Sequence, residues 1–156
     1  MNSGDQLIHN QVLIVGLVAW LSAQFLKVPI EYIRSRRRLW ALWFSSGGMP
    51  SSHSALMTSI TLAIGLFNGF NTPLFALAFA ISMVVVYDAT GVRREAGRHA
   101  EKINILVNEF FSGQPISEKQ LKEVIGHTPA QVVAGVFLGV IVALLFYWIW
   151  TIAPAG

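Results

Sequence analysis

Residues 47–53 read Gly-Gly-Met-Pro-Ser-Ser-His and precede an uncharged apolar run that starts at Ala55. A helix beginning near Ser52 leaves unpaired N–H groups at its first turn, where the helix dipole also places partial positive charge. Phosphate binds readily at such a helix start. The glycines allow the backbone to approach a ligand closely, and the serines and His53 add side-chain contacts. The alternative is that Ser51 or Ser52 only caps the helix and that His53 lies at a membrane surface.

A second histidine, His127, precedes the last apolar run of the chain. Thr128 fits an N-cap, Pro129 the first helical position and Gln131 the third position of a capping box. The sequence therefore predicts two helices that each begin beside a histidine.

Composition indicates a membrane protein, because 54% of the residues are hydrophobic and only 12% are charged. An ordinary soluble domain carries about 25% charged residues. No Asp, Glu, Lys or Arg occurs in residues 39–87 or after residue 123. The chain has no cysteine, which excludes a thiolate metal site and a cysteine nucleophile.

Four apolar runs predict about four transmembrane helices, at residues 7–26, 54–70, 74–87 and 132–152. The first run has about the ~20 residues needed to cross hydrocarbon, and it lacks the features of a cleaved signal. We expect an all-α, polytopic membrane helical bundle with short interfacial helices, formed as one domain over residues 1–156. Gly135 and Gly139 form a small-x-x-x-small face, which indicates helix packing inside the chain or, less often, a homodimer contact.

All lysines and arginines lie in two segments, residues 27–53 and 88–127, which four crossings place on the same side of the membrane. The loop-charge rule makes that side cytoplasmic and puts both termini outside, in a cell inner or plasma membrane. The same topology brings five ionisable residues to one depth: His53, Asp88, Arg93, Arg94 and His127. Ionisable groups at such depth tend to be functional. The alternative is that the basic residues only set orientation and bind anionic lipid.

With these residues in view, the sequence resembles the divergent membrane branch of the type 2 phosphatidic acid phosphatase superfamily, which is related to acid phosphatases and vanadium-dependent haloperoxidases. The superfamily's first motif is Lys, six residues, Arg-Pro, and Lys27 and Arg34 match its spacing with Ser35 in place of proline. The second motif is Pro-Ser-Gly-His, and residues 50–53 match it with Ser52 in place of glycine.

The third motif is Ser-Arg, five residues, His, three residues, Asp. His127 resembles the histidine of this motif, and the residues after it resemble the helix that follows that histidine. The arginine position holds Leu121, with Lys122 beside it, and the aspartate position holds Gln131.

These departures leave candidate substitutes elsewhere in the chain. Arg93 or Arg94 could supply the guanidinium, and Asp88 or Glu123 could supply the carboxylate. A second alignment pairs Arg93 with His99, which also have the Arg, five residues, His spacing.

The resemblance implies hydrolysis of a lipid phosphomonoester or pyrophosphate without a metal ion or cofactor. His127 would attack phosphorus and His53 would act as general acid and base. Phosphate would be held by Lys27, Arg34, Ser51, Ser52, Arg93 and Arg94. The expected partners are a membrane lipid phosphate and the bilayer, and no nucleic acid.

Two alternatives remain open. Leu121 and Gln131 replace only the residues that would support the nucleophile and leave the phosphate-binding residues in place. The chain could therefore bind or transport a lipid phosphate without cleaving it. A divalent-metal site built from Asp88, Glu95 and His99 is the weaker alternative, since their spacing also fits a surface network of satisfied charges.

Overall fold

The computed structural model describes residues 2–35, 47–110 and 126–152, and within these ranges the chain is helical with no strand. The helices are α1 (Ser3–Ile8), α2 (Gln11–Ser35), α3 (Ser52–Asn68), α4 (Pro73–Thr90), α5 (Val92–Phe110) and α6 (Pro129–Ile152). This confirms the expected all-α helical bundle.

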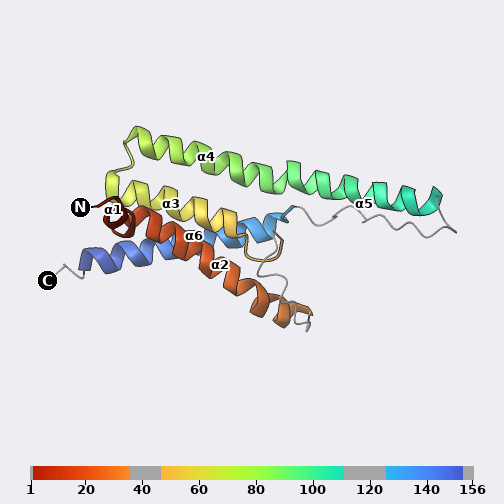
Figure 1. The fold of residues 1–156 in the computed structure, drawn as a ribbon, viewed down its shortest axis with the longest axis horizontal. Coiled ribbons are helices and arrows are strands. Elements are labelled where there is room, and N and C mark those ends of the chain that lie inside the picture. The colour runs from red at the N-terminus through yellow and green to blue at the C-terminus, as the bar shows by residue number, and fades with distance from the viewer. Residues whose placement is uncertain (1, 36–46, 111–125, 153–156) are drawn as a thin grey trace.

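Helix α3 is the centre of the bundle, because α2, α4 and α6 all pack against it (Figure 1). The start of α2 and the end of α6 lie at one end of the bundle. The ends of α2 and α4 and the starts of α3 and α6 lie at the other end. This second end, here called the polar end, therefore gathers the segments that carry the candidate site residues.

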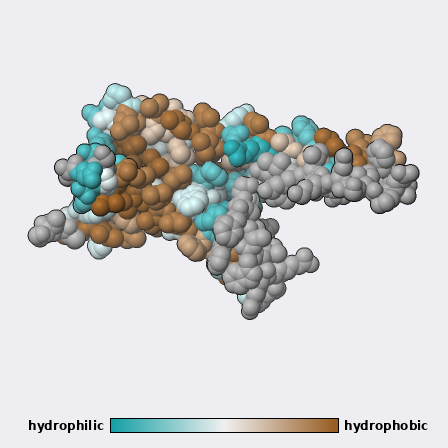
Figure 2. Space-filling model, in the orientation of Figure 1, coloured by the Kyte–Doolittle hydropathy of each residue, from teal (hydrophilic) through white to brown (hydrophobic). Residues whose placement is uncertain are grey.

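Three segments within the described ranges are long and apolar enough to cross a membrane: Gln11–Ile33, Pro73–Val107 and Pro129–Ile152. Helix α3 is uncharged but has only 17 residues, which span about 26 Å at the helical rise, against a hydrocarbon thickness of about 30 Å. Hydrophobic side chains cover most of the visible face of the bundle, and hydrophilic ones gather toward its ends (Figure 2). We therefore treat α2, α3, α4 and α6 as the four crossings.

The first crossing differs from the expected residues 7–26. The chain breaks between α1 and α2, where the Asn10 side-chain oxygen accepts a hydrogen bond from the Leu13 backbone N–H at 3.0 Å. Helix α2 then continues through Pro29 to Ser35. Lys27 therefore lies on the same helix as the backbone of Arg34, close to two turns away.

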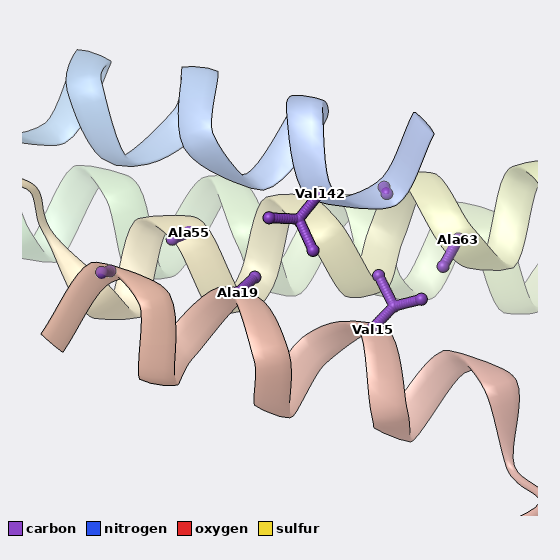
Figure 3. Packing of buried hydrophobic residues seen from close by; sticks show 7 residues of the cluster. Val15, Ala19, Ala55, Ala63 and Val142 are labelled. Carbon is purple, nitrogen blue, oxygen red and sulfur yellow. The ribbon is translucent and has the colours of Figure 1, made fainter. Parts of the chain in front are cut away.

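The core of the bundle is built from small side chains, which let the helix backbones approach closely. Figure 3 shows Val15 and Ala19 of α2 facing Ala55 and Ala63 of α3 and Val142 of α6. Alanine at these positions makes close contact possible where a longer side chain would hold the helices apart.

Gly135 and Gly139 lie in the contact between α6 and α3. A Cβ atom added at Gly135 would lie 2.4 Å from the Ser51 carbonyl oxygen, and one at Gly139 would lie 2.6 Å from the Ala55 carbonyl oxygen. The structure therefore shows that this glycine face packs against another helix of the same chain. A homodimer contact through Gly135 and Gly139 stays a prediction that the structure does not show.

Candidate functional site

His127 is fixed to the end of α4 through its backbone. Its N–H donates to the carbonyl oxygen of Ala89 at 3.1 Å. Immediately before it, Gly126 lies so close to the start of α5 that an added Cβ would stand 2.5 Å from the Arg94 Cα and backbone N atoms. Only glycine fits this approach, which places His127 beside the junction of α4 and α5.

The start of α6 is in turn joined to the start of α3. The Ser51 N–H donates to the Gln131 carbonyl oxygen at 2.9 Å. The Ser51 hydroxyl caps α3, where it accepts from the Ser54 N–H at 3.4 Å and from the Ser54 hydroxyl at 2.9 Å. The structure therefore shows Ser51 as the cap of α3. A contact from its hydroxyl to phosphate stays a prediction.

The side chain of Gln131 orients the imidazole of His127. Its Oε1 accepts from the Thr128 N–H at 3.0 Å, while the Thr128 hydroxyl accepts from the Gln131 N–H at 3.4 Å, which confirms the predicted capping box. The same Oε1 lies 3.2 Å from Nδ1 of His127. An amide oxygen only accepts hydrogen bonds, so Nδ1 carries the proton in this contact. In the neutral ring, Nε2 of His127 then holds the free lone pair.

Electrostatics also keep the His127 ring neutral. The side chain is 4% exposed, and this burial lowers its pKa below the ordinary value near 6.5. The hydrogen bond with Gln131 raises the pKa, whereas Lys27, His53 and Arg93 lower it further. Among the described residues, every ionisable group that acts on His127 is therefore a base that repels a proton from its ring.

These groups come from different helices. Lys27 lies on α2 and is 1% exposed, His53 lies in the first turn of α3, and Arg93 lies in the first turn of α5. Arg93 and Lys27 also act electrostatically on His53. The polar end thus brings together Lys27, His53, Arg93 and His127, of which the topology argument had named His53, Arg93 and His127.

Backbone amides complete the site. Among the residues that the structure describes, the N–H groups of Ser52 and His53 have no hydrogen-bond acceptor, as expected at the first turn of a helix. They stand beside the cationic groups named above, so this helix start can bind an anion with both its amides and its dipole.

Comparison with known proteins agrees with the resemblance seen in the motifs. A family model described as the divergent PAP2 family matches residues 8–142. The chain belongs to the divergent PAP2 family. It is similar to the uncharacterized membrane protein YuiD of Bacillus subtilis (strain 168), with 38% identity over 151 residues that cover 90% of this chain and 96% of the relative. No solved structure matches the chain.

In this member of the divergent PAP2 family, the described contacts of Asp88 and Arg94 do not include the two imidazole rings. The carboxylate of Asp88 accepts a hydrogen bond from Nε of Arg93. It therefore supports the arginine, whereas Gln131 occupies the place beside the His127 ring. Arg94 is exposed, and among the described residues Arg93 is the arginine that acts electrostatically on both His53 and His127.

The carboxylates proposed for a metal site also have arginine partners. Glu95 accepts from Arg98 at 3.0 Å, as Asp88 does from Arg93, and His99 is exposed on α5. Within the described ranges no three His, Asp or Glu side chains are grouped to hold a metal ion. The network of satisfied surface charges is the arrangement that the structure shows.

Some predicted residues fall outside the described part of the chain. They are the side chain of Arg34 and the whole of Leu121, Lys122 and Glu123. The sequence reasoning missed the contact of Gly126 with the start of α5 and the bond from His127 to Ala89. The glycine directly before His127 was the available signal, because such a residue permits a close backbone approach.

Proposed function

We propose that this protein removes phosphate from a phosphomonoester or pyrophosphate carried on a membrane lipid, with His127 as the nucleophile. One observation carries the proposal: Lys27, His53 and Arg93 all act on a buried histidine whose ring is oriented by a neutral amide. A phosphate placed there would meet the positive charge that these groups supply. Membership of the divergent PAP2 family supports the same class of ligand.

The chemistry follows from the roles of the two imidazoles. Nε2 of His127 attacks phosphorus and the bond from phosphorus to the ester oxygen breaks. His53, whose protonated form would be favoured by the negative charge of the bound phosphate against Lys27 and Arg93, gives its proton to that oxygen. His53 then takes a proton from water, and the resulting hydroxide attacks phosphorus, which breaks the P–N bond and frees phosphate. Lys27, Arg93 and the amides of Ser52 and His53 hold the phosphate oxygens throughout.

The proposal also includes a location. By the loop-charge rule, the polar end would face the cytoplasm at a cell inner or plasma membrane, with both termini outside. Lys27 lies on a helix that crosses the membrane, so the phosphate would be bound close to the headgroup level, where a lipid presents it. The side chains of Arg34 and Ser52 would add contacts to it.

The test is phosphate release by purified protein in lipid vesicles that contain a lipid monophosphate. The wild type is expected to release phosphate, and the His127→Ala variant is expected to lose this activity. His9→Ala is the matched control, because His9 lies between α1 and α2 at the opposite end of the bundle. Equal turnover by wild type and His127→Ala would refute the assigned nucleophile.

A second function is favoured by one observation. Gln131 is a neutral partner for His127 and cannot stabilise an imidazolium or a phosphohistidine as a carboxylate would. The chain would then bind or transport a lipid phosphate without cleaving it. Saturable binding of the lipid phosphate with no phosphate release, in wild type, would establish this alternative.

A further inference from the structure

An apolar cavity of about 350 Å³ lies between α3, α4 and α6 and opens at the surface of the bundle, since Phe79 and Met83 in its lining are more than half exposed. Helices α4 and α6 both pack against α3 but make little contact with each other. The cavity occupies the space that their separation leaves. Its volume falls in the range of ligand pockets, which is roughly 300 to 1,000 Å³.

One end of the cavity lies close to the candidate site on all three helices. On α4 it is lined by Val86, three residues before Ala89, whose carbonyl oxygen accepts from the backbone of His127. On α6 it is lined by Val136, five residues after Gln131, and on α3 by Thr58, five residues after His53. Five residues correspond to about 7.5 Å along a helix axis.

From this end the cavity extends toward the opposite end of the bundle. Its lining on α4 runs from Val86 back to Phe75, a distance of about 16 Å at the helical rise. That distance is about half of the 30 Å hydrocarbon core of a bilayer. The cavity therefore has the depth of one leaflet and begins beside the phosphate-binding groups.

We infer that this cavity binds one hydrocarbon chain of the lipid whose phosphate occupies the polar end. The inference rests on the proposed site, and it adds the class of substrate: a phosphate attached to a long apolar chain. The inference is supported by continuity, because the same three helices carry His53, the end of α4 and the segment after His127 at the site and then line the cavity. A water-soluble phosphate would leave the cavity unused.

The test fills the cavity from α6. Val140 lines it, whereas the next residue, Ile141, is 59% exposed on the surface of α6. Val140→Phe and the matched control Ile141→Phe are compared on a long-chain phosphatidic acid and on glycerol phosphate. We expect Val140→Phe to lower kcat/KM for the long-chain substrate by at least about tenfold, as small changes in apolar pockets do. Glycerol phosphate turnover stays unchanged, and Ile141→Phe resembles wild type.

A second variant and a binding assay keep the test independent of folding and of catalysis. Met83→Trp fills the same cavity from α4 and is expected to act as Val140→Phe does. A phosphatidic acid with a photoreactive group on its chain should label α4 and α6 in wild type and in Ile141→Phe, and label them weakly in Val140→Phe. This labelling needs no hydrolysis. If the protein is labelled but releases no phosphate, the proposed phosphatase activity is refuted while binding of a hydrocarbon chain in the cavity is supported.

The inference is overturned if Val140→Phe lowers both substrates equally, if Ile141→Phe has the same effect, or if labelling is unchanged by filling the cavity. It is also overturned if a photoreactive amino acid placed at Val140 links two protein chains on irradiation, since a second copy would then be the occupant.

Discussion

Replacing Gln131 with glutamate changes one atom beside the His127 ring and places a negative charge there. The Gln131 side-chain oxygen lies 3.2 Å from Nδ1 of His127, and the ring is 4% exposed. In wild type, burial and the nearby positive groups lower the pKa of His127, so the ring is neutral at neutral pH. A carboxylate at the same position favours the charged imidazolium and raises this pKa.

The size of the change follows from the distance. An opposite charge within about 4–6 Å shifts a pKa by about 1–3 units, so Gln131→Glu is expected to raise the pKa of His127 by that amount. If neutral Nε2 of His127 is the nucleophile, activity falls as pH drops through this pKa. The acid limb of the pH profile then moves to higher pH in Gln131→Glu, by the same number of units.

The assay is an NMR titration of protein labelled with ¹⁵N-histidine in lipid nanodiscs. The chain has four histidines, so each signal can be assigned by a single substitution. Gln11→Glu at the start of α2, far along the bundle from His127, adds the same charge as a control. An unchanged His127 titration in Gln131→Glu would refute the orienting role of Gln131, whatever the activity.

Two further predictions concern Gly126, which lets the backbone before His127 approach α5, and Arg93, which adds positive charge to the site. Gly126→Ala should lower the free energy of unfolding by about 1–3 kcal/mol, because its Cβ would meet the Arg94 backbone at 2.5 Å. Thermal unfolding in detergent checks this, with Gly4→Ala as the control, since a Cβ there meets nothing within 4 Å; equal melting of the two variants would count against the close approach. Arg93→Gln should weaken binding of inorganic phosphate by about tenfold or more, as loss of a charged hydrogen bond does. Calorimetry should find Arg94→Gln near wild type, and equal losses in both variants would remove the distinction between the two arginines.

The fold was largely predictable because long charge-free runs leave few alternatives to membrane helices. The starts of α3 and α6 were predictable from capping residues, and the structure places Thr128 and Gln131 in the expected reciprocal bonds. The start of the first crossing was not, because hydropathy continues through Leu7 and Ile8, while the break shows only in local capping such as the Asn10 side-chain oxygen that accepts from the Leu13 N–H.

The candidate site was predictable as a set of residues and less so as a set of contacts. Topology alone predicted that His53, Arg93 and His127 lie at one end of the bundle, whereas Lys27 was a candidate through the spacing of the first motif. The choice of Arg93 over Arg94 depends on how the chain turns at Gly91, between α4 and α5, and spacing does not encode that turn. The pairing of Asp88 with Arg93 has the same origin.

The central claim is that His127 attacks a phosphate that His53, Lys27 and Arg93 help to hold. Its most direct test is to react the protein with a lipid carrying ³²P-labelled phosphate, stop the reaction, and locate the label by mass spectrometry. We predict an acid-labile label on His127 that forms and decays more slowly in His53→Ala and is absent from His127→Ala. Phosphate release without any label, or a label on another residue, would contradict the account.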